Sequence, residues 1–446
     1  MFKIFANAWR VQDIRKKLLF IFLLLLIYRF GTAIPLPGID LQTLSDFRYG
    51  GAMPWDTAAT LFQMIMGGGI GSIFAMGIAP YITASIIMQL LTYAIPALAQ
   101  MQKEGEDGRK KIGQITRYMA VGLAAVQAAA TVFSYTNFHG TGANLFRYGN
   151  MMVYVVATLA MVTGTIFIMW LAELLTEKGI GNGASFLIFA NILSQLPQGI
   201  MMMWHFMTDG ETNRFVAVVI VIVVLAVFAL IIAFVVMVHE GERRIPVQYS
   251  KSAAGGRSMF GNQSSYIPLK VNIAGVLSII FAVTLLQFPT MIMGFIPPSE
   301  DPGWFVRRFG PGPDGVLNIG GPHGFHWIGL LVYVVLIFAF THFYTSFAVN
   351  PVEMAENMKK NGGFIPGIRP GKPTSEFIQT TVNRLSWIGA VFYSLIALSP
   401  IILDQLTGIP VGFGGTTLLI VIGVALEFIK QLESQLLMRH YKGFLS

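Results

Sequence analysis

The sequence predicts an all-α polytopic membrane protein, and three observations lead to this fold class. Of the 446 residues, 54% are hydrophobic and only 12% are charged, which is too little charge to cover the surface of a soluble domain of this length. Mean hydropathy is +0.64. The chain contains no cysteine, so disulfides and thiolate metal sites are excluded.

Apolar segments long enough to cross a bilayer as helices recur ten times along the chain. The fifth and ninth are the most polar, since they include residues such as Asn191 and Ser394. We expect no cleaved signal peptide, because the basic N-terminus leads directly into the first segment without a small-residue cleavage site. The predicted spans cover residues 18–34, 73–95, 116–134, 151–171, 183–203, 215–238, 271–296, 326–347, 386–403 and 413–437.

The distribution of lysine and arginine predicts the orientation of these spans. The N-terminal tail and the loops on its side of the membrane carry a net charge of +11, whereas the loops on the other side sum to −4. Cytoplasmic loops are enriched in basic residues. Both termini are therefore expected in the cytoplasm.

Ten spans that begin and end on the same side divide into two sets of five, residues 1–203 and 204–446. Because five is odd, the second set enters the membrane from the opposite side, as an inverted repeat requires. Similarity between the two halves is not visible residue by residue. The predicted repeat therefore rests on topology.

Two cytoplasmic loops, residues 239–270 and 348–385, are each longer than 30 residues, whereas connections above about 12–15 residues are usually functional or disordered. Their basic residues either set the topology alone or dock an acidic soluble partner or an RNA backbone. Aromatic residues are not interleaved with them, so RNA would be contacted by shape. The basic residues in question are Lys251, Arg257, Lys359, Lys360 and Arg369.

Recognisable enzyme chemistry is absent from the sequence. The stretch VHEGERR at 238–244 lacks the second histidine of a zinc motif, and the glycines at 67–71 lack the strand–helix context of a nucleotide site. We identify no acidic residue or histidine near the centre of a span, where coupling ions would bind. Arg29 lies near the outer end of its span, where it can reach water. A passive conduit is favoured, an ion-coupled transporter with inverted repeats stays open, and an intramembrane hydrolase lacks catalytic residues.

Residues 66–90, MGGGIGSIFAMGIAPYITASIIMQL, place four glycines in front of an apolar run. Ile82 and Ile86 follow four residues apart, on one face of the expected helix. Branched side chains that line a pore can close it by dewetting. Ordinary helix packing or lipid contact explains the same pattern, so both interpretations stand on these residues alone.

Seven stretches spread from the first span to the last together resemble the SecY family, whose members are the channel subunit of the bacterial protein-export translocon. The resemblance implies ten spans around an hourglass pore with a re-entrant plug, in the plasma membrane. It implies passage of unfolded preproteins and lateral release of transmembrane segments into lipid, without catalysis or a cofactor. The stretches are RFGTAIPLPGID (29–40), FAMGIAPYITASIIMQLLT (74–92), KEGEDGRKKIGQITRY (103–118), GIGNG (179–183), IPLKVNIAGV (267–276), GGFIPGIRPG (362–371) and FGGTTLLIV (413–421).

The resemblance also implies a ring of side chains at the narrowest part of the pore. One ring position departs from the family, because it is occupied by the small Ala184. Ile192, or a plug residue such as Met64 or Met66, would compensate for the missing volume. The implied ring consists of Ile82, Ile86, Ala184, Ile188, Ile280 and Ile420.

The plug implied by the resemblance lies near residues 60–72, on the extracytoplasmic side of the ring. Glycine lowers the cost of changing its backbone conformation, and methionine packs adaptably. The expected plug residues are Met64, Met66, Gly67, Gly68, Gly69 and Gly71.

The family has a lateral gate, where the second and seventh spans part. Hydrogen bonds between spans are worth only about 0.6 kcal/mol each, so an apolar signal helix that binds the open state preferentially would tip the equilibrium. The polar candidates in these spans are Ser85, Gln89, Thr284 and Gln287.

The long loops resemble the docking sites for the motor ATPase SecA and for the translating ribosome. Arg369 occupies the position that is central to coupling in the family, and Lys251 and Arg257 hold basic positions in the earlier loop. Ser258 stands where some members have a second arginine. The resemblance further implies the small partner subunits SecE and SecG.

Overall fold

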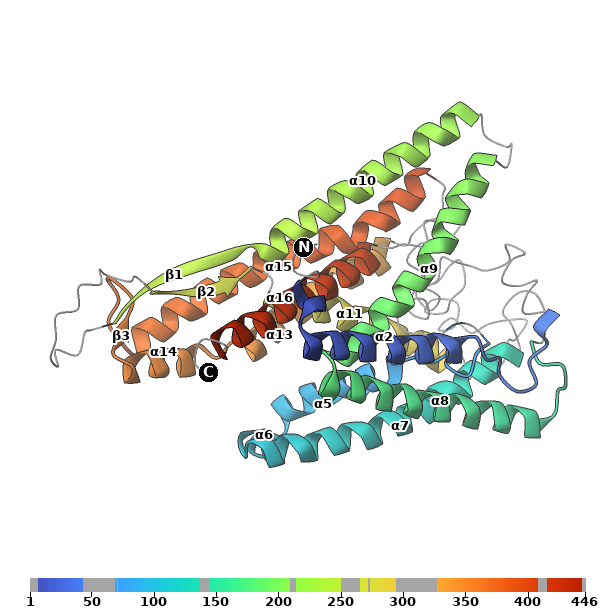
Figure 1. The fold of residues 1–446 in the computed structure, drawn as a ribbon, viewed down its shortest axis with the longest axis horizontal. Coiled ribbons are helices and arrows are strands. Elements are labelled where there is room, and N and C mark those ends of the chain that lie inside the picture. Colours follow the sequence, from blue (N-terminus) through green and yellow to red (C-terminus); the bar gives the residue numbers. More distant parts are fainter. Residues whose placement is uncertain are drawn as a thin grey trace.

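A computed structural model describes residues 7–42, 69, 71–136, 145–208, 214–249, 265–271, 273–293, 327–407 and 415–442 (Figure 1). Each of the ten apolar segments overlaps one helix of more than 15 residues. These helices are α2 (Gln12–Thr32), α5 (Ala79–Ala94), α7 (Glu106–Thr136), α8 (Met151–Lys178), α9 (Gly183–Thr208), α10 (Arg214–Glu240), α11 (Leu277–Met293), α13 (Trp327–Ala348), α15 (Lys372–Thr407) and α16 (Gly415–Lys442).

Two short helices were not predicted. Helix α6 (Pro96–Lys103) follows α5 after a bend of 101°, because Pro96 favours an extended residue before it and a new helix after it. Helix α14 (Pro351–Lys360) is capped by Asn350, whose side chain accepts a hydrogen bond from the backbone N–H of Glu353 at 3.3 Å. An asparagine cap followed by proline is a typical helix start.

Six apolar helical stretches in the described part of the chain are long enough to cross a membrane, and the bent pair α5–α6 makes a further candidate. The outward faces of the long helices, α2 included, carry large apolar side chains. Ile222 and Leu230 on α10, for example, expose 60% and 69% of their surface, and Phe30 on α2 exposes 75%. Such an exterior suits lipid and not water. The six stretches are Glu106–Phe133, Met151–Lys178, Gly183–Thr208, Arg214–Glu240, Trp327–Lys360 and Lys372–Ser399.

The long helices pack in two groups whose contacts follow the same pattern. In the first group α2 contacts α8 and α9, α5 contacts α7, α7 contacts α8, and α8 contacts α9. In the second, α10 contacts α15 and α16, α11 contacts α13, α13 contacts α15, and α15 contacts α16. In both groups the first helix contacts the fourth and the fifth. From the second helix to the fifth, each helix contacts the next one along the chain.

The two groups meet along two seams. Helix α9 contacts α10 and α16, and α5 and α7 contact α11. Figure 1 shows α2, α5, α7 and α8 on one side of the molecule, α10, α15 and α16 on the other, and α9 running between them. Helices from both groups therefore border the centre of the molecule.

A three-stranded antiparallel sheet in the order β2-β1-β3 unites the two long loops. Strand β1 (Glu242–Tyr249) and strand β2 (Ser265–Lys270) belong to the first loop, and β3 (Gly363–Phe364) belongs to the second. Gln248 on β1 lies opposite Phe364 on β3. A separate buried cluster joins the sheet to α14 and α15, and it contains Ile245, Val247, Leu269, Met358, Ile365, Ile378, Val382 and Leu385. We call residues 242–249, 265–270 and 351–385 the sheet module. Figure 1 shows it at one end of the molecule.

Candidate functional site

Helix α5 presents Ile82 and Ile86 on one face, as their spacing of four residues predicts. The helix begins at Ala79, with Pro80 in its first turn. Ile86 is 7% exposed and Ile82 is half-buried. Ile86 is therefore buried in the protein, and Ile82 packs against the same buried cluster.

Helix α9 supplies the next set of aliphatic side chains, and its start is held firmly. The backbone N–H of Ala184 donates to Oδ1 of Asn182 at 3.0 Å, and that of Gly183 donates to Oγ1 of Thr176 at 2.9 Å. A Cβ atom on Gly183 would overlap the backbone oxygen of Ala172 on α8. Only glycine lets the two helices approach this closely.

The six side chains that the family resemblance assigns to the ring lie in or against one buried cluster. Ile86, Ile188, Ile280 and Ile420 are members of one buried apolar cluster, each 7% exposed or less, and Ile82 and Ala184 pack against it. The four helices involved, α5, α9, α11 and α16, come from both groups. The side chains are aliphatic, so an ion at this point has no partner to replace its water.

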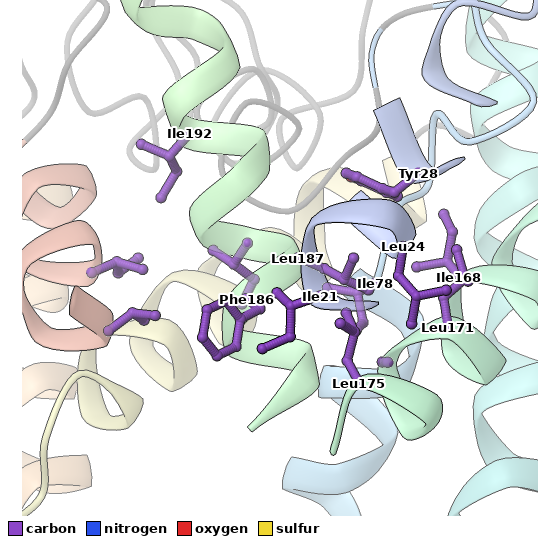
Figure 2. Close-up of a cluster of buried hydrophobic side chains, with 14 of the residues drawn as sticks. Ile21, Leu24, Tyr28, Ile78, Ile168, Leu171, Leu175, Phe186, Leu187 and Ile192 are labelled. Carbon is purple, nitrogen blue, oxygen red and sulfur yellow. The ribbon is translucent and has the colours of Figure 1, made fainter. Parts of the chain in front are cut away.

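Ile192, which the sequence offered as compensation for Ala184, is 2% exposed and belongs to the same cluster. Figure 2 shows it projecting from α9 on the side opposite Leu187, which faces Leu24 of α2. Sequence reasoning missed Val424, a further member at 8% exposure. Its spacing of four residues from Ile420 is the signal that would have found it.

Three of the four gate candidates can be placed, Ser85 and Gln89 on α5 and Thr284 on α11, two helices that contact each other. Thr284 is 5% exposed, and its Oγ1 atom has no hydrogen-bond partner among the described residues. By contrast, the Oγ1 atom of Thr341 on α13 donates to the backbone oxygen of Ile337 at 2.6 Å. Ser85 and Gln89 are half-buried. The side chain of Gln287 lies outside the described part.

Two aromatic pairs that sequence reasoning did not propose lie near this seam, one between the helix groups and one within the second group. The rings of Tyr93 on α5 and Phe343 on α13 meet edge to face, with centroids 5.7 Å apart. Phe281 on α11 makes a similar contact with Phe340 on α13 at 5.7 Å. Edge-to-face pairs are worth about 0.5–1.5 kcal/mol beyond their buried area. The helices are distant in sequence, so no local pattern signals these pairs.

Only part of the expected plug segment is described. Gly69 and Gly71 have φ angles of +104° and +71°, a region that other residues rarely adopt. These two glycines are therefore required by the backbone. Met64, Met66, Gly67 and Gly68 lie outside the described residues.

The basic docking candidates that can be placed lie on the sheet module. Lys359 and Lys360 form the exposed last turn of α14. Arg369 is exposed in a turn between Gly367 and Gly371, both with positive φ, and its backbone oxygen accepts a hydrogen bond from Thr374 at 2.9 Å. Lys251 and Arg257 lie outside the described ranges.

A further exposed arginine on the module went unnoticed in the sequence. Nε of Arg244 lies 2.6 Å from Oε1 of Glu242, and its guanidinium lies 5.0 Å from the centre of the Tyr266 ring. The hydrogen bond with Glu242 raises the pKa of Arg244. Arg244 therefore stays positively charged at neutral pH.

Comparisons with known proteins point to one family along the whole chain. A family profile described as SecY matches residues 72–429. The chain is 41% identical to protein translocase subunit SecY of Halalkalibacterium halodurans and 40% identical to that of Bacillus subtilis, and each alignment covers 100% of both chains.

Two solved structures share the fold at 17% identity. The first, described as "The structure of a protein conducting channel", gives a TM-score of 0.64 over 93% of this chain and 90% of that one. The second, described as "Sec61 in the Canine ribosome-channel complex from the endoplasmic reticulum", gives 0.60 over the same shares.

Proposed function

The chain belongs to the SecY family, and we infer from this that it forms a protein-conducting channel, a multi-pass protein of the bacterial plasma membrane. It is a channel subunit and not an enzyme. Unfolded preproteins cross the bilayer through it, and transmembrane segments leave it sideways into lipid. The observation that carries this function is the convergence of aliphatic side chains from α5, α9, α11 and α16 in one buried cluster.

We propose that the ten long helices all span the membrane, in two inverted halves of residues 1–203 and 204–446 with both termini in the cytoplasm. The repeated contact pattern of the two helix groups supports this division, and the charge distribution supports the orientation. The pore then lies between the halves, where α9 meets α16 and α5 meets α11.

At the waist of this pore, the aliphatic ring keeps the closed channel dry. Water leaves a narrow apolar constriction readily, and an ion that lacks a compensating partner does not enter it. A polypeptide in transit parts the ring and replaces its contacts. Segment 60–72 covers the ring as a plug, and the positive φ angles of Gly69 and Gly71 suit such a sharply folded segment.

The lateral gate lies at the seam of α5 with α11 and α13. Among the described residues, the pair of Tyr93 and Phe343 links α5 to α13, and Thr284 on α11 has a buried hydroxyl without a hydrogen-bond partner. An unsatisfied buried polar atom costs free energy only while it stays away from water. Thr284 therefore favours the open gate, and an apolar signal helix that binds the open state shifts the balance further.

Replacing Thr284 with Val should tighten the closed gate, because valine keeps the shape of threonine and removes the unpaired hydroxyl. We expect export of a preprotein with a weak signal sequence to slow by about fivefold, the ratio that corresponds to about 1 kcal/mol. Thr341→Val, which removes a satisfied hydroxyl on α13, is the matched control. Faster export by the Thr284→Val channel would instead mean that this hydroxyl holds the gate shut.

The sheet module is the proposed docking site for SecA and the ribosome, with Lys359, Lys360 and Arg369 on its surface and Lys251 and Arg257 in the same loops. Strand β2 ends at Lys270 and leads after six residues into α11 at Leu277, so a force on the module reaches a gate helix directly. SecE is proposed to clamp the two halves and SecG to bind at one edge.

Export into proteoliposomes tests the function. Vesicles that contain this chain with SecE, SecG, SecA and ATP should protect a preprotein from added protease, and removal of its signal sequence should abolish protection. Protection should persist when ion gradients are collapsed. Uptake of a small solute by the chain alone, lost with the gradient, would instead identify an ion-coupled transporter.

A further inference from the structure

Residues 71–78 form an irregular segment directly before α5, the helix that carries Ile82 and Ile86. The segment is bound to the chain just after α2, the first helix of the first group. The segment consists of turns, closed for example by the backbone N–H of Gly77, which donates to the oxygen of Phe74 at 2.8 Å. All of its residues except Ile73 are buried. A segment without helical hydrogen bonds at this depth needs protein around it, and α2 and α8 supply that protein.

Backbone hydrogen bonds fix the start of this segment to the chain just after α2. The N–H of Leu36 donates to the oxygen of Gly71 at 2.9 Å, and the N–H of Ile73 donates to the oxygen of Ile34 at 3.0 Å. These reciprocal bonds form a short antiparallel bridge. The segment cannot slide along α2 without losing both bonds.

The ring of Phe74 is inserted between aromatic rings from both neighbouring helices. It stacks on Tyr28 of α2 with a centroid distance of 6.1 Å and on Phe167 of α8 with one of 5.8 Å. The interplanar angles are 12° and 22°. The ring is therefore held from two sides and has little freedom to turn away.

Two glycines make this close packing possible. Gly31 lies three residues after Tyr28 on α2, and a Cβ atom there would overlap the ring of Phe74, with Cζ at 2.6 Å and Cδ2 at 2.7 Å. Gly164 lies three residues before Phe167 on α8, and a Cβ atom there would overlap the backbone oxygen of Ile73. Residues three apart share a helix face, so each helix offers an aromatic ring and a glycine to the same segment.

The segment continues without a break into the helix that carries the ring isoleucines. Helix α5 begins at Ala79, and the N–H of Ile82 donates to the oxygen of Ile78 at 3.1 Å. Phe74, Ile78 and Ile86 belong to one buried cluster. A displacement at Phe74 is therefore passed to the ring through close-packed side chains.

We propose that Gly31 and Gly164 are positioning residues for the constriction. Their missing side chains let α2 and α8 clamp residues 73 and 74, and this clamp sets where α5 starts and holds Ile82 and Ile86 in the ring. The proposal rests on the channel function proposed above. It assigns a role in sealing to two helices that contribute no side chain to the ring itself.

The test is resting ion conductance of reconstituted channels, with the folded fraction measured by size-exclusion chromatography. Gly31→Ala and Gly164→Ala should each leak about tenfold more than the unchanged chain, because overpacking shifts the start of α5. Gly122→Ala on α7 is the matched control, since a Cβ atom there meets nothing within 4 Å. Adding Phe74→Ala to Gly31→Ala removes the overlapping ring and should restore most of the seal.

Each outcome decides the proposal. A folded Gly31→Ala channel that stays tight overturns it, as does a double variant that leaks as much as the single one. If Gly31→Ala does not accumulate, recovery of folded protein by the added Phe74→Ala supports the packing, and failure to recover contradicts it. Ile420→Asn, measured in parallel, distinguishes the role of the glycines from the role of the ring. If Ile420→Asn leaks and both glycine variants stay tight, only the glycine inference is rejected. If none of the three variants leaks, the ring itself is rejected.

Discussion

Replacing Ile420 with Asn should raise the resting ion conductance of the channel by about 5- to 150-fold, the range that corresponds to about 1–3 kcal/mol for a buried polar group without a partner. Ile420 is 2% exposed in the cluster that joins α16 to α5, α9 and α11. An asparagine amide in that place is satisfied only when water enters the waist. The substitution therefore favours the hydrated, open state, and defective signal sequences should be exported better.

The control for this variant lies two residues along the same helix. Ile422 is 9% exposed and belongs to a different buried cluster, within the second helix group. Ile422→Asn introduces the same polar group at similar burial without facing the ring. Ile280→Asn should repeat the effect of Ile420→Asn from α11. If Ile420→Asn and Ile280→Asn both keep the resting conductance and the signal stringency of the unchanged chain, these residues do not form the constriction.

Arg369→Glu should reduce SecA-driven export by about tenfold or more while the closed channel stays tight. Arg369 is exposed in the turn that joins β3 to α15, so its replacement leaves the buried core of the sheet module intact. Reversing a charge at a docking surface replaces attraction by repulsion, which costs several kcal/mol in a close pair. The measurement is the rate of ATP-dependent preprotein protection in proteoliposomes.

Arg214→Glu, at the exposed first residue of α10, changes the net charge of the chain equally. The proposed orientation places it on the side of the membrane away from the motor. It should therefore export normally. Full export by Arg369→Glu would exclude this arginine from the partner site.

The helices were predictable because hydrophobicity is a local property of the sequence. Each of the ten apolar segments overlaps a helix, although α7 starts ten residues before its segment, at Glu106, and α15 starts at Lys372, well before residue 386. In both cases polar turns continue the helix beyond the apolar run. Hydropathy therefore finds where a helix passes through lipid and does not find where it ends.

The sheet module was not predictable in the same way. Strand β3 has only two residues, too few for any periodic pattern, and its partner Gln248 lies more than 100 residues before Phe364. The strand contacts α14 and pairs with β1, so it depends on tertiary packing. The sequence showed two long basic loops without a pattern that links them, and the structure joins them in one unit.

The candidate site shows the same contrast. The spacing of Ile82 and Ile86, and of Ala184 and Ile188, predicts a shared face on one helix, but the meeting of α5 with α11 is a tertiary fact that the resemblance supplied. At the gate, polarity alone suggested a hydrogen bond for Thr284. The structure gives its Oγ1 atom no partner among the described residues, because the neighbour of a side chain across a seam is not encoded in its own helix.

Disulfide formation between a stalled preprotein and single cysteines in the ring tests the central claim most directly. The chain has no cysteine of its own, so Ile280→Cys or Ile420→Cys creates a unique thiol of small, apolar character. A preprotein halted in transit, with a cysteine at the halted position, should bond to both ring thiols and not to Ile422→Cys. Equal bonding at Ile422→Cys, or none at the two ring positions, would show that the polypeptide takes another path.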